Sequence, residues 1–238
     1  MLRIENLCKS YDGKTQAVSG LSLHVESGDI FGFLGHNGAG KTTTIKCVTS
    51  LLPFESGSIA IDGLDIKENS MECRRRTAYL PDNPDLYDHL TGMQYLNFMG
   101  DVFRVGTDER KALISRYADA FGLSGALATR VGEYSHGMKQ KLALIGALIH
   151  KPRLLVLDEP FVGLDPVAAH RVKEILAELC REGSAVFFST HVLEVAEKLC
   201  NKLAIIKEGK IVICGKTADV VGDETLEDIF LELAGHDA

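Results

Sequence analysis

The chain has 238 residues, which is enough for one sizeable α/β domain with room for an inserted subdomain. Its formal net charge of −7 argues against nucleic acid as the main partner, because proteins that bind the phosphate backbone usually present a basic face. The six cysteines lie far apart without a C-x-x-C pair, so the sequence indicates neither a zinc site nor a disulfide framework. We expect reduced, mostly buried thiols in a cytosolic protein.

No run of residues approaches the ~18 to 20 consecutive apolar residues of a membrane-spanning helix. If the protein works at a membrane, we therefore expect another chain to cross it.

The N-terminal part of the chain reads as a small antiparallel sheet. Residues 2–7 and 18–25 alternate between apolar and polar side chains, and Gly13 and Lys14 provide a turn between them. Residues 58–62 continue the same pattern. We therefore expect an N-terminal antiparallel β subdomain.

A phosphate-binding loop comes next. Residues 30–34 read as a short buried strand and residues 42–51 as a helix, and the sequence between them fits G-x-x-x-x-G-K-[ST]. The glycines let backbone N–H groups close around phosphate oxygens at the positive end of the helix dipole. Lys41 can then reach the β- and γ-phosphates, and the Thr42 hydroxyl can ligate Mg²⁺. The predicted nucleotide-binding residues of the loop are Gly35, His36, Asn37, Gly38, Ala39, Gly40, Lys41, Thr42 and Thr43.

The middle of the chain changes from a helical to an alternating α/β pattern. After a loop at residues 81–84, the sequence is helical from about 91 to 148 without strong strand runs, which indicates an inserted helical subdomain. Strands return at residues 153–157 and 184–189 around a helix at 167–181, as in a β–α–β unit of a parallel sheet.

The last third closes the domain. Residues 203–206 and 210–213 read as a hairpin, and residues 225–233 as an amphipathic helix that packs on the body or on a partner. Together the elements predict one α/β domain with a P-loop NTPase core and a parallel sheet. The predicted parts are a nucleotide-binding core with the β subdomain (residues 1–82 and 149–217), a helical subdomain (83–148) and a C-terminal tail helix (218–238).

Two carboxylates end the strand at residues 153–157, at the edge where ligands of open α/β sheets bind. Asp158 is suited to hold Mg²⁺, and Glu159 is the candidate general base that orients the attacking water. His191 follows the next predicted strand, where one ring nitrogen could contact the γ-phosphate and the water. Without the phosphate loop, a solvated strand end and a structural histidine would be the default interpretations. With it, the predicted catalytic residues are Lys41, Glu159 and His191.

Five motifs in a fixed order make the chain resemble the ATP-binding subunits of ABC transporters over nearly its whole length. They are the phosphate loop, the signature Tyr134-Ser-His-Gly-Met138 where the family usually has L-S-G-G-Q, the acidic strand end at residues 154–160 after Lys151-Pro152, a D-loop at residues 163–166, and an H-loop at residues 189–191.

The resemblance implies a head-to-tail dimer with ATP and Mg²⁺ as cofactors, in which Ser135 and Gly137 of one chain close over ATP held by the other. It implies that Tyr11 stacks on adenine, for which packing within the first hairpin is the alternative. It also places Asp82 where most members have a glutamine that touches Mg²⁺. The predicted metal ligands are therefore Thr42, Asp82 and Asp158.

Three positions depart from the usual family pattern. The charge of Asp82 near the γ-phosphate should alter nucleotide affinity. His136 replaces a signature glycine and either adds a donor to phosphate when charged or points to solvent, and Met138 removes any polar contact of the usual glutamine. Together with the ending at residues 225–231, these features resemble the branch that serves exporters, so export is favoured over import.

We therefore expect Mg-ATP hydrolysis at a dimer interface, with force passed to a separate membrane permease through the surface near residues 82–95. The second ATP-binding subunit can be the same or a different chain, and we expect no nucleic-acid partner. The protein would be cytoplasmic, held on the inner face of the cell membrane by its permease. One alternative is a soluble ABC-type ATPase acting on ribosomes or DNA, disfavoured because the chain has neither a heptad run nor a duplication. Another is a P-loop kinase, which would not need Ser135 to Gly137 or His191.

Overall fold

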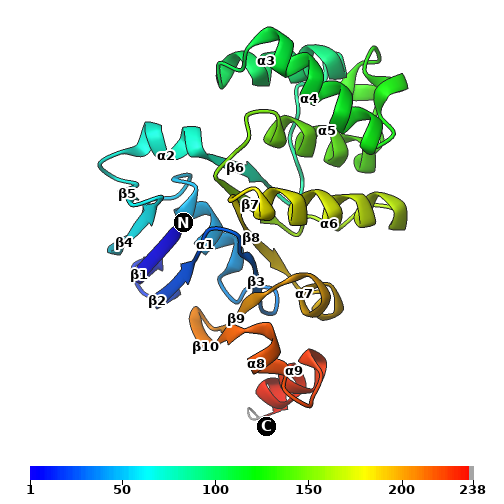
Figure 1. Cartoon of the computed structure of the whole chain (residues 1–238). Coiled ribbons are helices and arrows are strands. Elements are labelled where there is room, and N and C mark those ends of the chain that lie inside the picture. Colours follow the sequence, from blue (N-terminus) through cyan, green and yellow to red (C-terminus); the bar gives the residue numbers. More distant parts are fainter. Residues whose placement is uncertain (236–238) are drawn as a thin grey trace.

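The computed structural model describes residues 1–235 (Figure 1). The predicted tail helix at 218–238 therefore has its last three residues outside the described part. No helix among residues 1–235 is both long and apolar enough to cross a membrane.

The predicted N-terminal β subdomain is confirmed as a four-stranded antiparallel sheet. Its strand order is β2-β1-β4-β5, with bounds β1 (Leu2–Ser10), β2 (Gln16–Val25), β4 (Ser56–Ile61) and β5 (Leu64–Asp65). Leu2 and Ile4 of β1 are buried because the pleat sends alternate side chains to the core face of the sheet, and an irregularity at Asn6, whose φ is +48°, shifts the alternation so that Leu7 is buried as well.

The core is a six-stranded sheet of order β10-β9-β3-β8-β7-β6. Its strands are β3 (Ile30–Leu34), β6 (Thr77–Leu80), β7 (Leu154–Asp158), β8 (Ala185–Thr190), β9 (Lys202–Lys207) and β10 (Lys210–Lys216). All neighbours pair in parallel except β9 and β10, which form the predicted hairpin. Every residue of β3, β7 and β8 is buried, as expected of parallel strands covered on both faces.

Some helices pack around the core sheet, and others form the predicted helical subdomain. Around the core lie α1 (Lys41–Val48), α2 (Ser70–Arg76), α6 (Pro166–Arg181) and α7 (Leu193–Leu199). The subdomain consists of α3 (Gly92–Val102), α4 (Thr107–Ala120), the short 3₁₀ turns η1 (Ser124–Ala126) and η2 (Val131–Glu133), and α5 (His136–Leu148). The chain closes with α8 (Thr217–Val221) and α9 (Leu226–Gly235) at the opposite end of the molecule (Figure 1).

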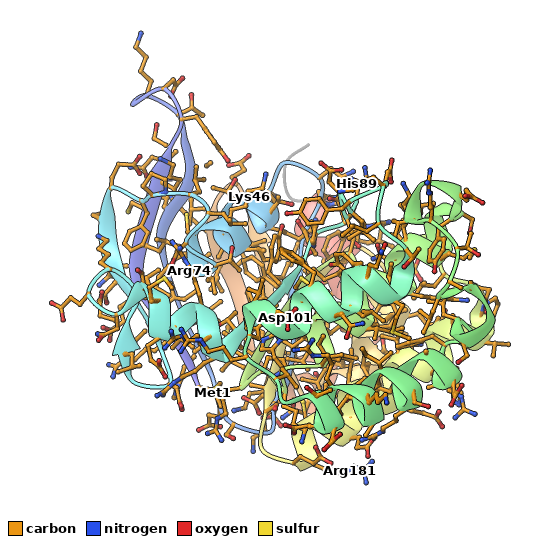
Figure 2. The ribbon with its side chains drawn as sticks, turned by 90° about the horizontal axis from the view of Figure 1, so that it is seen from above. Met1, Lys46, Arg74, His89, Asp101 and Arg181 are labelled. Carbon is orange, nitrogen blue, oxygen red and sulfur yellow. The ribbon has the colours of Figure 1, made fainter. Side chains whose placement is uncertain are left out.

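Seen from above, the N-terminal sheet and the helical subdomain lie on opposite sides of the molecule (Figure 2). The link from β6 to α3 contains Pro81 and Pro84 and ends at Thr91, whose side chain caps α3 in a reciprocal box with Gln94. No element is predicted from the sequence at α2, α7 or β6, and α2 and α7 span only seven residues each, too few for a helical period to show. The tail helix predicted at 218–238 is divided into α8 and α9 within the described residues.

The buried side chains form two clusters, one on each face of the core sheet. In the cluster under the N-terminal sheet, the Phe187 ring lies between Phe31 and Phe33, with centroid distances of 5.9 and 5.4 Å. All three side chains are at most 1% exposed. This aromatic packing ties β3 to β8, the two strands that lead into the phosphate loop and the H-loop.

Replacing Phe187 by alanine should lower the free energy of unfolding by about 3–5 kcal/mol, because the cavity cannot fully collapse between the two sheets. Urea denaturation followed by circular dichroism measures the change. Val212→Ala, at a side chain that is 43% exposed on β10, is the control and should change stability little. Equal effects of the two substitutions would show that the packing of Phe187 on β3 contributes little to stability.

Candidate nucleotide-binding site

The phosphate loop connects β3 to α1, and its backbone packs closely against β9 and β2. A methyl group on Gly35 would lie 2.5 Å from the carbonyl oxygen of Ile206 at the end of β9. A methyl group on Gly40, whose φ is +109°, would lie 2.5 Å from the carbonyl oxygen of Ala17 in β2. Only glycine fits at either position, so the loop conformation is fixed by the close approach of neighbouring backbone.

The ammonium group of Lys41 is turned into the loop. Its side chain belongs to a residue only 7% exposed, and Nζ donates to the carbonyl oxygens of Gly35 at 2.6 Å and His36 at 3.2 Å. Burial lowers the pKa of Lys41, while the nearby carboxylates of Glu159 and Asp158 oppose that shift. A buried cation whose hydrogen bonds go only to neutral carbonyls is well suited to receive an anion such as phosphate.

Asp158 is fixed by two hydroxyl groups. Thr42 Oγ1 donates to Asp158 Oδ2 at 2.8 Å, and Ser189 Oγ donates to Asp158 Oδ1. Asp158 itself is only 2% exposed. The hydroxyl and carboxylate oxygens are of the kind that Mg²⁺ prefers. In residues 1–235 no three His, Cys, Asp or Glu side chains gather as a metal site, so Mg²⁺ would also need oxygens of the nucleotide.

Glu159 and His191 meet beside this cluster. Glu159 Oε1 lies 2.9 Å from Nδ1 of His191, whereas Glu159 Oε2 is buried with no hydrogen-bond partner. The Glu159 backbone has φ +49°, which is uncommon for a residue other than glycine. An unpaired buried carboxylate oxygen and a strained backbone both cost stability, and such features concentrate at functional sites.

The sequence reasoning named Ser189 within the H-loop but gave it no role. Its hydroxyl donates to Asp158, as above, and accepts the backbone N–H of Glu159 at 3.2 Å. The pairing of Asp158 with Ser189 in the β7–β8 register places it there. The one available signal is a hydroxyl residue near the end of an otherwise apolar buried strand, at the edge where the ligand is expected.

A cavity of about 350 Å³ brings most of the predicted residues together. It is lined by Tyr11, Ala17, His36, Asn37, Gly38, Gly40, Lys41, Thr42, Thr43, Asp82, Asp158 and Glu159. Asp82 is exposed, and its Oδ1 accepts the backbone N–H of Asn83 at 2.8 Å. The cavity therefore combines the Lys41 ammonium and the anion-binding loop with the carboxylates of Asp82, Asp158 and Glu159.

Tyr11 stands at the mouth of the cavity rather than packing within the first hairpin. Its side chain is 67% exposed, and its hydroxyl lies 3.1 Å from Thr43 Oγ1. Tyr11, Ala17 and Gly38 also line a second, open hollow of about 600 Å³. The two hollows together suit an elongated ligand with phosphates in the loop and a flat ring near Tyr11.

The signature residues lie outside this cavity. Ser135 is the N-cap of α5 and accepts the backbone N–H of Met138 at 3.3 Å. The imidazole of His136 lies against Gly163, where an added methyl would come within 2.6 Å of Cδ2. Neither expectation for His136 described this contact between the signature and the D-loop. In the single chain, Ser135 and Gly137 thus do not complete the site that holds Lys41.

Comparisons with known proteins agree with this geometry. The model of the family described as "ABC transporter" matches residues 18–162. The Nod factor export ATP-binding protein I of Burkholderia thailandensis is 37% identical over 229 residues, covering 96% of this chain and 75% of that protein. An uncharacterized ABC transporter ATP-binding protein of Synechocystis is 34% identical over 92% of this chain, which spans 62% of that relative.

Among solved structures, an ATP-binding subunit of an ABC transporter superimposes with a TM-score of 0.94 at 30% identity. The match covers 98% of this chain and 99% of that one. On this family match, sequence identity and shared architecture, the chain belongs to the ABC transporter family, among its ATP-binding subunits.

Proposed function

We propose that the chain hydrolyses Mg-ATP and thereby powers export through a separate membrane permease. One observation carries the catalytic part: the Glu159 carboxylate, paired with His191 on one oxygen and buried without a partner on the other, lies beside Lys41 and Asp158. The Burkholderia relative is named as a Nod factor export protein, which supports the direction of transport. The permease would hold the protein on the cytoplasmic face of the membrane.

The residues of the site divide into those that bind phosphate, those that hold Mg²⁺ and those that activate water. The loop N–H groups and Lys41 would bind the phosphates, with the ammonium exchanging the Gly35 and His36 carbonyls for phosphate oxygens. Thr42 and Asp158, with Asp82 at the cavity wall, would hold Mg²⁺. When bound, Mg²⁺ neutralises charge on the phosphates and favours displacement at the γ-phosphate. Glu159 Oε2 would accept a proton from the attacking water, while His191 fixes Oε1.

A second ATP-binding subunit would complete the site. Ser135 is exposed and caps α5, and the positive N-terminal end of that helix suits the γ-phosphate bound by the partner. Val162 and Val192 are 45% and 38% exposed close to Glu159 and His191 in sequence. Exposed apolar side chains beside a polar site fit burial in a head-to-tail dimer.

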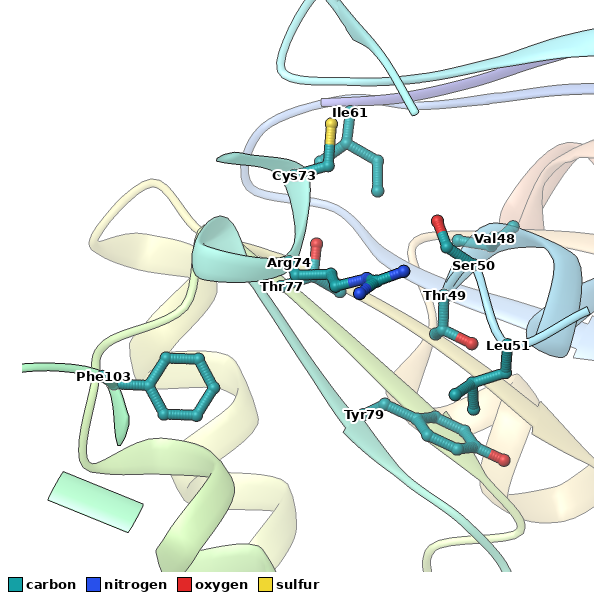
Figure 3. Close-up of a pocket in the computed structure, with 10 residues that line it drawn as sticks. All are labelled: Val48, Thr49, Ser50, Leu51, Ile61, Cys73, Arg74, Thr77, Tyr79 and Phe103. Atoms are coloured by element: carbon teal, nitrogen blue, oxygen red, sulfur yellow. The ribbon is translucent and has the colours of Figure 1, made fainter. Parts of the chain in front are cut away.

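The surface that runs from residues 82–95 to the ends of α1 and α2 suits a permease contact. Two hollows of about 200 Å³ each share Thr77, Tyr79 and Phe103, and Figure 3 shows the first of them. In that view Phe103 lies on one side and Tyr79 with Leu51 on the other. The exposed apolar side chains Leu51, Met71, Tyr87, Phe98 and Val102 lie on elements that line or flank the hollows.

Charge on this surface also suits a permease segment. Asp82, Asp85 and Asp88 are exposed on the link between β6 and α3, and cytoplasmic permease loops are rich in Lys and Arg. In the second hollow His150 stacks on Phe103 at 3.7 Å, and burial lowers its pKa to about 4, so it is neutral. The occupant we infer is a short apolar segment with basic residues at its rim.

Replacing Glu159 by glutamine should retain ATP binding but reduce hydrolysis at least about 10²-fold, because an amide cannot accept the proton. It should also accumulate a Mg-ATP dimer. Phosphate release and size-exclusion chromatography measure the two effects. The exposed Glu224→Gln is the matched control and should hydrolyse normally. Normal turnover in Glu159→Gln would remove Glu159 from the role of base.

Replacing Ser189 by alanine should reduce kcat about tenfold or more, because hydrogen bonds to charged groups contribute about 1.5–3 kcal/mol. The substitution frees one oxygen of Asp158, so the Mg²⁺ concentration for half-maximal rate should rise as well. Steady-state assays across a Mg²⁺ series measure both. Ser189→Thr, which keeps the hydroxyl, should recover much of the rate, and equal loss in both variants would contradict a role for the hydroxyl.

Replacing Tyr87 and Phe98 together by alanine should preserve ATPase activity of the isolated subunit while reducing recovery of a polytopic membrane protein by about tenfold or more. The two rings form an exposed edge-to-face pair at 5.5 Å. Affinity purification of tagged chains from detergent-solubilised native cells with Mg-ATP, followed by mass spectrometry, measures the recovery. Val212→Ala should behave as wild type, and recovery of ribosomes in place of a membrane protein would favour a soluble target.

A further inference from the structure

We propose that the C-terminal helix α9 holds the phosphate loop in its nucleotide-binding conformation, and that Phe230 is the positioning residue through which it does so. The proposal rests on the nucleotide site of the proposed function and assigns that site a support outside its own motifs. It concerns nucleotide affinity alone and does not depend on the permease or on the direction of transport.

The contact joins two aromatic rings. Phe230 of α9 and His36 of the phosphate loop have centroids 4.6 Å apart with an interplanar angle of 57°. His36 belongs to the exposed part of the loop, residues 36–38. The close backbone contacts found at Gly35 and Gly40 do not extend to these residues. The Phe230 ring therefore packs on the part of the loop that the neighbouring backbone leaves open.

His36 is also connected to the catalytic lysine through its backbone. Its carbonyl oxygen accepts hydrogen bonds from Lys41 Nζ at 3.2 Å and from the backbone N–H of Ala39, also at 3.2 Å. A displacement of His36 would thus change both the turn of the loop and the resting position of the Lys41 ammonium. The aromatic contact is therefore made by a residue of the phosphate loop itself.

Helix α9 is firmly attached to the body of the domain. Leu226 is fully buried and Ile229 is 8% exposed, and the backbone N–H of Leu226 donates to Glu197 Oε2 on α7 at 3.0 Å. At its other end, Lys207 Nζ donates to the carbonyl oxygen of Leu233 at 2.8 Å. Lys207 ends β9, directly after Ile206.

The same strand end therefore supports the loop from two directions. The Ile206 carbonyl lies behind Gly35, and Lys207 holds the helix whose Phe230 ring lies on His36. The space between β9, Val212 of β10, His36 and Phe230 is only about 20 Å³, which is room for about one water molecule. It is too small for a ligand, so this is a packed joint rather than a second binding site.

Such a joint should raise nucleotide affinity by reducing the conformational freedom that the loop loses on binding. An aromatic contact of this kind corresponds to about a twofold to tenfold change in the dissociation constant. Coupling between two sites is reciprocal, so bound nucleotide should in turn stabilise α9.

The test is a double-mutant cycle on Phe230→Ala and His36→Ala, with Mg-ADP binding measured by calorimetry. Each single variant should raise the dissociation constant about twofold to tenfold, and the double variant should be no weaker than the weaker single variant. Phe230→Ala should raise the KM for ATP with little change in kcat. Leu231→Ala, at the exposed neighbouring position, is the matched control and should match wild type. Additive losses, or affinity unchanged in Phe230→Ala, would overturn the proposal.

Hydrogen exchange separates this role from a purely structural one. Saturating Mg-ADP should slow amide exchange of residues 226–233 in the wild type, and His36→Ala should abolish that protection although it leaves the helix itself intact. Protection that persists in His36→Ala would also overturn the proposal. Failure of the wild type to bind Mg-ADP would instead contradict the proposed function, so the two failures are distinguishable.

Discussion

The parallel pairing of β3, β7 and β8 is the constraint on which the nucleotide site depends. All three strands are buried on both faces, and their carboxyl ends lie at one edge of the core sheet. The register pairs Leu34 with Thr190 and Asp158 with Ser189. Because core packing resists any slip of these strands, Asp158 is held at the end of β7, and Glu159, His191 and the phosphate loop that carries Lys41 all start from buried strand ends at the same edge.

The site holds charged groups that a ligand can pair. The ammonium of Lys41 lies near the carboxylates of Asp158 and Glu159, and Glu159 Oε2 has no partner. In the described structure, protein groups take the places that we assign to ligands: the Gly35 carbonyl receives the ammonium, and Thr42 binds Asp158. Nucleotide binding is then an exchange of partners within a prepared arrangement, which reduces reorganisation at the moment of reaction.

Local motifs could be predicted because their geometry depends on residues that are consecutive in the sequence. The strand, loop and helix around residues 30–51 follow from sequence spacing, as does the acidic end of β7. The contacts of Ser189 with Asp158 and of Phe230 with His36 join residues far apart in sequence. They depend on strand register and on the docking of a helix, and neither is encoded in any single segment. The same holds for the contact of His136 with Gly163, because it joins the helical subdomain to the core.

The link between β6 and α3 has a mechanical consequence. It runs from the catalytic side at Asp82 to the helical subdomain, and it contains Pro81 and Pro84 and is tied down at Thr91 by the helix cap. Proline fixes φ and restricts the residue before it, and the carbonyl oxygens of Asp88 and Leu90 accept backbone N–H groups of Gly132 and Val131 at 3.0 and 2.8 Å, so this connection has few ways to bend. It should therefore behave as a stiff strut: a shift of the core beneath Asp82 is delivered to α3 as a displacement, with little of it absorbed as slack.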